Sequence, residues 1–345
     1  MVAFGATNAD GGMMKSLKWV VNTILLTSLS LSVIAEDKPG VPNNWSKWGK
    51  DDERGAANYL TAKEIVKAAK LIRRGKVFSL AIPIASDGPV HPSRIPPQHL
   101  FTMTGSDYVA GQPPTLGEMK FADDYIFMPL QGSTQWDGLA HAWYGDSLYN
   151  GFPQGSTRTK PTGGGATKIG IENVKTSFVG RGVLIDVLAH KGTLAPGYPI
   201  TRADIEATLK AQGTKVKRGD IVLIRTGFIP GFYEYIDPIE RMTYVAGPQT
   251  GIMTDVVNWI DEQEIAGIAA DNVALEVMPH PNPDLTLSMH GSLLRDLGVY
   301  IGEIWWLEEL AADCKEDGRY EFFLAAQPLN IPGAVGSPIN PIAIK

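Results

Sequence analysis

Three short and almost continuous apolar runs constrain the fold of this chain more than any other feature of its sequence. They cover residues 182–187, 220–225 and 265–270. Such runs are typical of strands that are buried on both faces of a sheet. Apolar residues at helical spacing predict helices at residues 201–209, 254–263 and 292–297. We therefore expect an α/β fold with a mixed sheet.

The first part of the expected domain carries further local patterns. Thr61 precedes apolar residues at helical spacing and Glu64 follows three positions later, which predicts a helix over residues 61–72. Apolar runs at 77–84 and 125–130 predict two more strands, and the run at 125–130 is also expected to be buried. Between them, residues 87–114 are rich in Gly and Pro and are expected to form a long loop. Loops of that length in a compact domain are usually functional or mobile.

Length and charge narrow the class of protein. The chain has 345 residues and a formal net charge of -6 at pH 7. An acidic chain without a basic stripe is not expected to bind nucleic acid. The single cysteine, Cys314, cannot form an internal disulfide. We expect one α/β domain at residues 36–345, large enough to bury a sizeable core.

The N-terminus has the pattern of an export signal. Lys15 and Lys18 precede an apolar run over residues 19–33, and Val33 and Ala35 occupy small-residue cleavage positions. The run is shorter than the roughly 20 residues that a membrane span needs. We expect residues 1–35 to contain an upstream start and a signal peptide, and the mature protein to be secreted or periplasmic without stable membrane insertion. The alternative is an N-terminal anchor that is never cleaved.

The most chemically suggestive stretch is 131–141, which contains Asp137 and His141. A carboxylate and an imidazole four residues apart meet only if the segment is helical there. Gly138 and the preceding Gly-Ser-Thr favour a loop, which could still bring both groups to one point. Taken alone, a pair with this spacing is more often a surface or capping interaction, because short motifs have many false positives.

Three stretches together resemble the cyclase family, which includes bacterial kynurenine formamidases and isatin hydrolases. Residues 131–141 resemble its metal-binding signature H-x-G-T-H-x-D-x-P-x-H, with Asp137 and His141 at the Asp and last His positions. Residues 289–303 resemble the late His-to-Glu segment of the family. Residues 48–61 resemble the W-G-x-x-D-E-x-G-x-x-N-x-L-T opening of its longer members. The resemblance implies a three-layer β/β/α fold with a partly barrel-like sheet, assembled as a homodimer or homotetramer.

The resemblance also implies roles for particular residues. Asp137 matches the aspartate that anchors the metal, and His141 matches the general acid/base. His290 and Glu303 match the pair that completes a second metal position or hydrogen-bonds the reacting water, so Glu303 is both a metal and a catalytic candidate. A divalent ion would polarise a carbonyl and activate water.

Gln131 and Gln135 stand where the family signature has histidine, so both are candidate metal ligands. Amide oxygens are neutral, hard and weak ligands that suit Mn²⁺ or Mg²⁺ better than Zn²⁺. Three alternatives remain open. A metal, with Mn²⁺ preferred over Zn²⁺ or Mg²⁺, is held by Asp137, His290 and Glu303 with help from Gln135; or His141 and Glu303 act without metal; or the protein has stopped catalysing.

Several other residues are candidates for the pocket. Arg94 and His99 in the long loop could cover the site, although loop residues of this kind are often solvated. Trp136, Trp143 and Tyr144 could form an aromatic wall or could be core packing. Asp271 and Asn272 end a predicted strand, a common position for ligand-facing groups in α/β sheets.

The sequence therefore predicts an exported metal-dependent hydrolase acting on C–N bonds of cyclic or aryl amides, or on lactones. Its substrate would be a small molecule. The alternative is a non-catalytic or metal-independent member of the family that binds a small aromatic or carboxylate ligand. Retention of Asp137, His141, His290 and Glu303 together favours the enzyme, because a binding pocket does not need that set.

Overall fold

The computed structural model describes residues 41–114, 116–159 and 164–345. The predicted leader at residues 1–35 lies outside these stretches, so it stays a prediction, as does the domain boundary at residue 36. No helix within the described stretches combines the length and apolar character that crossing a bilayer requires.

The described fold is a mixed α/β structure built on one large sheet that curls into a half-barrel, as predicted. In spatial order its strands are β1 (Val77–Ser79), β15 (Ile342–Ile344), β13 (Glu321–Ala325), β7 (Val179–Asp186), β9 (Ile221–Arg225), β11 (Gly267–Ala270), β12 (Tyr300–Glu303), β4 (Gln135–Asp137) and β14 (Gly336–Pro338). The central strands β7, β9, β11 and β12 are parallel, and the outer pairings are antiparallel. The three apolar runs thus form the parallel centre of the sheet, which is buried.

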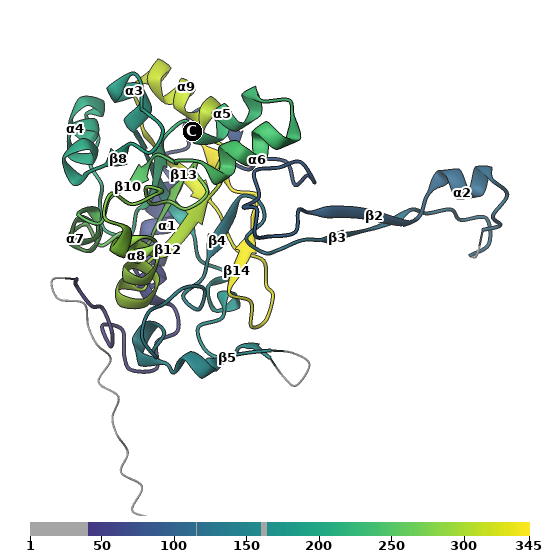
Figure 1. Cartoon of the computed structure of the whole chain (residues 1–345), viewed down its shortest axis with the longest axis horizontal. Helices are drawn as coiled ribbons and strands as arrows, with labels where there is room; N and C mark the ends of the chain where they lie inside the picture. Colours follow the sequence, from purple (N-terminus) through teal and green to yellow (C-terminus); the bar gives the residue numbers. More distant parts are fainter. Residues whose placement is uncertain (1–40, 115, 160–163) are drawn as a thin grey trace, which may run out of the picture. The chain divides into compact units, whose positions relative to one another are not determined.

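Three further strand pairs lie outside this sheet. They are β8 (Pro199–Ile200) with β10 (Gly251–Ile252), β2 (Gln98–Met103) with β3 (Asp123–Phe127), and β5 (Thr157–Arg158) with β6 (Gly165–Ala166). The β2–β3 pair is a hairpin that extends away from the rest of the described fold and carries a short helix beyond its strands (Figure 1).

The helices are α1 (Ala62–Ala69), α2 (Gly105–Val109), α3 (Val187–Lys191), α4 (Arg202–Gln212), α5 (Phe228–Glu234), α6 (Pro238–Ala246), α7 (Val256–Glu262), α8 (Ser288–His290) and α9 (Glu308–Asp317). Helices α1, α4 and α7 lie where the sequence predicts them. At the start of α4, Thr201 and Asp204 form a capping box, in which each side chain bonds the backbone N–H of the other residue.

The structure corrects three local predictions. Residues 87–114 are not one plain loop, because they contain β2 and α2. The strand predicted at 125–130 exists as β3, but it is exposed along its whole length instead of buried. Residues 291–297 form a π-helix instead of an α-helix. π-Helical turns are rare and are frequently found at functional sites.

An aromatic stack supports the two strands that carry the candidate site. Trp136 on β4 is fully buried, with its ring centroid 4.6 Å from Phe178 and 5.1 Å from Trp305. Its Nε1 donates a hydrogen bond of 2.7 Å to the carbonyl oxygen of Ala326. Gly302 on β12 fits beside this stack because a Cβ there would lie 2.5 Å from the Cβ of Ala269. This packing fixes the positions of β4 and β12.

Candidate metal centre and pocket

The pairing of β4 with β12 brings together residues that are far apart in the sequence. Gln135 lies opposite Glu303, and Asp137 lies opposite Ile301 in the antiparallel register. Because side chains alternate between the two faces of a strand, Gln135, Asp137 and Glu303 share one face while Trp136 points to the other. Residues 135–137 are therefore a strand, whereas the sequence favoured a loop there.

His290 completes the cluster from the end of α8. Its Nε2 is 3.2 Å from Glu303 Oε1 and 3.9 Å from Asp137 Oδ2. Its Nδ1 is 2.7 Å from Oε1 of Glu276, a carboxylate with no exposed surface. Burial by itself would lower the pKa of His290, but the hydrogen bonds to Glu276 and Glu303 outweigh it and raise the pKa to about 10.

Asp137, His290 and Glu303 offer ligand atoms that all lie within 4.8 Å of one another, and all three residues are buried. We call these three residues and Glu276 the metal-site cluster. Burial raises the pKa of Asp137 to about 6, against the opposing effect of His141. This donor set contains two carboxylates and one imidazole, which is a combination that divalent ions accept.

Two buried oxygen atoms test whether a cation fits this cluster. Asp137 Oδ2 and Gln135 Oε1 have no hydrogen-bond partner among the described residues. A buried polar atom without a partner is costly, so such atoms call for an explanation. A divalent ion beside them would supply the missing interaction. The contact from Glu276 to His290 Nδ1 is also the arrangement by which proteins orient a metal-binding histidine. The residues therefore fit a divalent ion.

The two glutamines lie in different surroundings. Gln135 is fully buried, and its Nε2 is 2.8 Å from Glu303 Oε2 and 3.4 Å from Asp137 Oδ1. Gln131 lies beside His141, with 3.4 Å between its Nε2 and Nδ1 of the histidine. Thus Gln135 contacts the carboxylates of the cluster, whereas Gln131 contacts the predicted acid/base.

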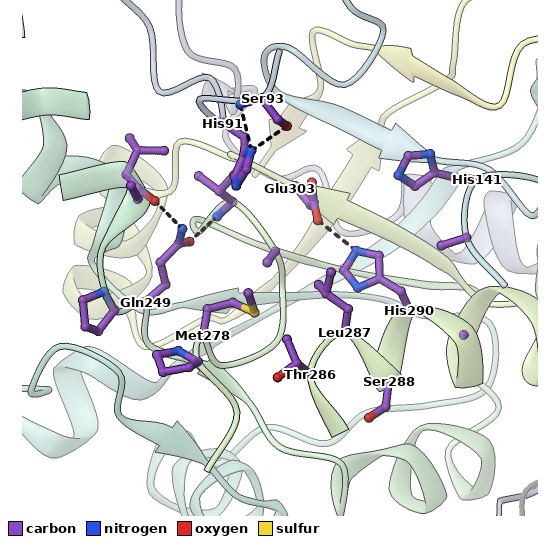
Figure 2. A pocket seen from close by; sticks show the side chains of 18 of the residues that line it. His91, Ser93, His141, Gln249, Met278, Thr286, Leu287, Ser288, His290 and Glu303 are labelled. Atoms are coloured by element: carbon purple, nitrogen blue, oxygen red, sulfur yellow. Dashed lines mark hydrogen bonds and ion pairs between the residues drawn. The ribbon is translucent and has the colours of Figure 1, made fainter. Parts of the chain in front are cut away.

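His141 stands at the edge of a pocket with a volume of about 990 Å³. Figure 2 shows His141 and the hydrogen-bonded pair of His290 and Glu303 around the same space, with His91 and Ser93 on another wall. His141 Nε2 is 3.8 Å from Asp137 Oδ2. Burial lowers the pKa of His141, partly against the influence of Asp137. The ring is therefore neutral at neutral pH and can accept a proton.

The other candidates are divided between pocket, core and surface. Arg94, Trp143 and Tyr144 line the pocket. The Nη1 of Arg94 donates a hydrogen bond of 3.0 Å to the carbonyl oxygen of Gln131. Trp136 belongs to the core. His99 is not at the pocket wall, because it lies on β2 and pairs with Asp124 at 2.5 Å.

Asp271 and Asn272 are both buried. Asp271 accepts hydrogen bonds from Thr226 and Gly227, each at 2.7 Å, so its carboxylate is occupied in holding a turn. Asn272 Nδ2 donates a hydrogen bond of 2.8 Å to the carbonyl oxygen of Thr250. Neither residue lines the pocket.

Sequence reasoning missed Glu276, which acts on the cluster only through His290. No motif or spacing marks it, because it lies among apolar residues at 273–277 that follow the end of a predicted strand. It also missed the apolar wall contributed by Val245, Val273, Met278 and Leu287. These residues come from loops and helix ends whose convergence depends on the tertiary fold.

Comparison with solved structures places this architecture among known ones. A structure described as "a novel cyclase" is 62% identical, covers 88% of this chain and 100% of its own, and superposes with a TM-score of 0.83. Isatin hydrolase A from Labrenzia aggregata, bound to benzyl benzoate, is 19% identical over 81% of this chain and 97% of its own, with a TM-score of 0.54. Isatin hydrolase A from Ralstonia solanacearum is 19% identical and covers 78% of this chain and 92% of its own. It superposes with a TM-score of 0.53. At that identity, the two hydrolases show a shared fold.

No curated protein sequence matches the chain at a significant level. The family model described as "Putative cyclase" matches residues 78–277. That match spans more than half of the chain and includes the Gln131–His141 motif, and the 62% identical structure extends the similarity over most of the remainder. The resemblance seen in the sequence is confirmed: the chain belongs to the cyclase family.

Proposed function

We propose that this protein is a metal-dependent hydrolase acting on C–N bonds of cyclic or aryl amides, or on lactones. The observation that carries the proposal is the buried metal-site cluster, with unpartnered oxygens on Asp137 and on the adjacent Gln135, beside a neutral histidine in the pocket. A cluster of buried carboxylates is costly to maintain without a compensating cation. Perturbed titratable groups in a pocket are typical of catalytic sites.

In this proposal Asp137, His290 and Glu303 hold a divalent ion, and Glu276 fixes the orientation of the His290 ring. When bound, such an ion supplies Lewis-acid activation of a carbonyl and of the attacking water. The donor set is rich in oxygen, so we propose Mn²⁺ as the preferred ion, with Zn²⁺ and Mg²⁺ as weaker alternatives.

His141 would transfer the proton from the attacking water to the leaving group. Its lowered pKa leaves the ring unprotonated at neutral pH, so it can accept a proton from the attacking water. The same proton can then pass to the leaving nitrogen or oxygen as the C–N or C–O bond breaks. The 3.8 Å distance from Nε2 to Asp137 Oδ2 keeps the imidazole next to the cluster during both transfers.

The pocket walls favour a planar apolar substrate. Trp143, Tyr144, Met278 and Leu287 provide aromatic and aliphatic surface, and Arg94 adds a cationic group. Aromatic side chains bind flat rings through offset or edge contacts. Support for an aryl or cyclic amide is therefore the combination of these walls with a hydrolytic centre at their edge.

One observation favours a second candidate, a metal-independent or non-catalytic member of the family. Gln135 Nε2 already donates toward both Glu303 and Asp137, and His290 bonds Glu303 as well. These donors could hold the carboxylates without an ion. In that case the pocket would bind a small aromatic or carboxylate ligand, or His141 and Glu303 would act alone.

An activity panel after metal removal separates the two candidates. The full-length protein is treated with a chelator, supplied with Mn²⁺, Zn²⁺, Mg²⁺ or no metal, and assayed with an aryl formamide, isatin and a γ-lactone. The proposal expects hydrolysis of at least one substrate that depends on added metal and is highest with Mn²⁺. Metal-independent hydrolysis, or substrate binding without turnover under every condition, would favour the second candidate.

We also propose that the protein is exported, on the basis of the charged and apolar pattern of residues 15–35. The mature chain would begin near Glu36. Intact-mass measurement of the protein from each cell fraction tests this. A full-length mass confined to the cytoplasm would contradict export.

A further inference from the structure

Arg94 places a positive charge on the pocket wall without a carboxylate beside it. The side chain is half-buried and lines the pocket. Among the described residues, the only hydrogen-bond partner of its guanidinium is the carbonyl oxygen of Gln131, at 3.0 Å from Nη1. Glu303 and Asp284 also line the pocket, but neither forms an ion pair with Arg94.

Arg225 shows the contrast. It is also half-buried, and its guanidinium bonds the carboxylates of both Asp186 and Glu308. A cation that is partly removed from water is costly unless it is paired and hydrogen-bonded. The planar guanidinium is suited to bonding a carboxylate through two N–H groups at once. Arg94 therefore has a charge and N–H groups available for an anion that enters the pocket.

Gln131 holds Arg94 near the proposed reaction centre. Its carbonyl oxygen accepts the bond from Arg94, while its side-chain Nε2 lies 3.4 Å from His141 Nδ1. Gln131 is itself closely packed, because a Cβ on Gly336 would lie 2.3 Å from this Nε2. The charge of Arg94 is close enough to help lower the pKa of both His141 and Asp137. An anion bound by Arg94 would therefore lie near the carbonyl that is hydrolysed.

The rest of the pocket limits what that anion can belong to. Trp143 and Tyr144 line the same pocket, and Met278 and Leu287 add aliphatic surface. Walls of this kind suit a flat aromatic ring. The excess negative charge of the metal-site cluster disfavours a dianion such as phosphate more than it disfavours a monoanion. The pocket therefore favours a carboxylate carried by an aromatic molecule.

We propose that Arg94 binds a carboxylate group of the substrate, and that this protein hydrolyses aryl amides that carry a carboxylate in addition to the amide. The inference rests on the proposed function, because it names the substrate class of the same pocket. The bound carboxylate takes no part in bond breaking. It anchors the ring so that the amide carbonyl lies beside His141, and a neutral relative of the same shape lacks that anchor.

A matched pair of substrates tests this selectivity. Each ring isomer of formamidobenzoate is compared with the corresponding formamidobenzamide, in which a neutral amide replaces the carboxylate at nearly the same size. The full-length protein is assayed for formate release with each metal of the activity panel. For at least one isomer, kcat/KM should be about tenfold or more higher for the carboxylate. Hydrolysis of every pair without this preference would contradict the proposal.

Variants of Arg94 assign the preference to this residue. Arg94→Gln keeps a donor for the carbonyl oxygen of Gln131 but removes the charge, so the preference should fall by about 10- to 100-fold, mainly through KM. Arg94→Lys keeps the charge without the planar pair of donors and should retain part of the preference. Arg73→Gln, at an exposed arginine that does not line the pocket, is the control. An equal loss of kcat on both substrates in Arg94→Gln would assign Arg94 to the reaction itself and defeat the proposal.

Binding of benzoate supplies a readout that needs no turnover. Chelator-treated and Mn²⁺-loaded protein are each titrated with benzoate and with benzamide by calorimetry, and thermal melting verifies that each variant is folded. The wild type should bind benzoate more tightly than benzamide, and Arg94→Gln should lose about tenfold or more in affinity for benzoate alone. The preference should weaken with added salt. If Arg94→Gln does not fold, Arg94→Lys takes its place, with an expected loss of several-fold.

The two readouts separate the failure of this inference from the failure of the proposed function. If no substrate is hydrolysed but benzoate binding depends on Arg94, the hydrolase proposal is wrong and the carboxylate site stands. If substrates are hydrolysed while benzoate binds the wild type and Arg94→Gln equally, or binds neither at millimolar concentration, the carboxylate site is wrong. Benzoate binding that requires Mn²⁺ and is unchanged in Arg94→Gln would place the carboxylate on the ion, which also overturns the inference.

Discussion

Two clusters of charged side chains in this protein, each built around a buried aspartate, have opposite electrostatic balance. The metal-site cluster contains three carboxylates and one imidazole. The second cluster, which we call the C-terminal ion cluster, joins Asp313 and Asp317 to Lys345, Lys76 and Arg74. In it, Lys345 Nζ is 2.7 Å from Asp317 Oδ1 and 3.0 Å from Asp313 Oδ2, and both Lys76 and Arg74 lie 2.5 Å from Asp313.

The pKa values report the difference between the two clusters. Burial would raise the pKa of Asp313, but hydrogen bonds from Lys76 and Lys345 outweigh it and lower the pKa to about 2. Among the described residues no lysine or arginine bonds Asp137, and burial raises its pKa to about 6 against the opposing effect of His141. The C-terminal ion cluster therefore neutralises itself within the chain, whereas the metal-site cluster keeps excess negative charge and unpartnered oxygens. The charge balance of the C-terminal ion cluster stabilises the fold, whereas the excess negative charge of the metal-site cluster suits a bound cation.

The largest expected effect is at His141, which adjoins the metal-site cluster. His141→Ala should lower kcat by about 10²–10⁴-fold, because the proton would lose its carrier. Initial rates on the best substrate of the panel give the loss, and a thermal melt shows that the fold is kept. His190→Ala, which changes an exposed histidine on α3, is the control. Full activity in a folded His141 variant would remove this residue from the mechanism.

A smaller effect, on metal affinity, is expected at Glu276, which orients the His290 ring. Glu276→Gln replaces the carboxylate at His290 Nδ1 and should weaken divalent metal binding by about 10–100-fold, as for other carboxylates behind a ligating histidine. Calorimetric titration with Mn²⁺ measures the change. Glu316→Gln at an exposed position on α9 serves as the control. Equal affinity in both variants would mean that Glu276 does not position the ligand.

In the C-terminal ion cluster the expected change is in stability instead of activity. Asp313→Asn leaves buried Lys345 with one carboxylate partner fewer and should reduce the free energy of unfolding by about 3 kcal/mol. Urea denaturation measures this loss, and the activity per folded molecule should stay at the wild-type level. A stability equal to that of the wild type would show that the cluster is not a structural device.

The smallest expected effect is the pH dependence from the same residue. The folded-state pKa of Asp313, about 2, lies below its ordinary value of 3.8. Its contribution to stability is therefore fully present above pH 4 and is lost as the pH falls from about 4 to about 2, amounting to about 2 kcal/mol. Unfolding free energies across that range should fall less steeply for Asp313→Asn than for the wild type. Parallel curves would contradict this assignment.

The resemblance of two local motifs to the cyclase family predicted Asp137, His290 and Glu303 as site residues, although the sequence favoured a loop where β4 forms. Gln135 and Asp137 occupy alternate positions of one strand, and β12 delivers Glu303 opposite them through an ordinary antiparallel register. Glu276 could not be predicted, since a second-layer carboxylate needs no fixed spacing from the histidine that it orients. The direction of the Gln131 side chain toward His141 also depends on tertiary packing.

The β2–β3 hairpin shows a different limit of sequence reasoning. Tyr125, Ile126 and Phe127 have the apolar and β-forming character of a buried strand, so the sequence predicts burial there. Apolar residues report that a surface is to be covered, and they do not report whether the covering comes from the same sheet or another molecule. The structure places these residues on an exposed hairpin.

The central claim is that the metal-site cluster is built to hold a divalent ion, and a metal titration tests it most directly. Chelator-treated wild-type protein, Asp137→Asn and Asp313→Asn are each titrated with Mn²⁺ and followed by calorimetry, with ion content checked by elemental analysis. We predict a single saturable Mn²⁺ site per chain in the wild type and in Asp313→Asn, and a loss of affinity of at least about 100-fold in Asp137→Asn. If the wild type binds no Mn²⁺, Zn²⁺ or Mg²⁺ at millimolar concentration, or if Asp137→Asn binds as tightly as the wild type, the claim is wrong.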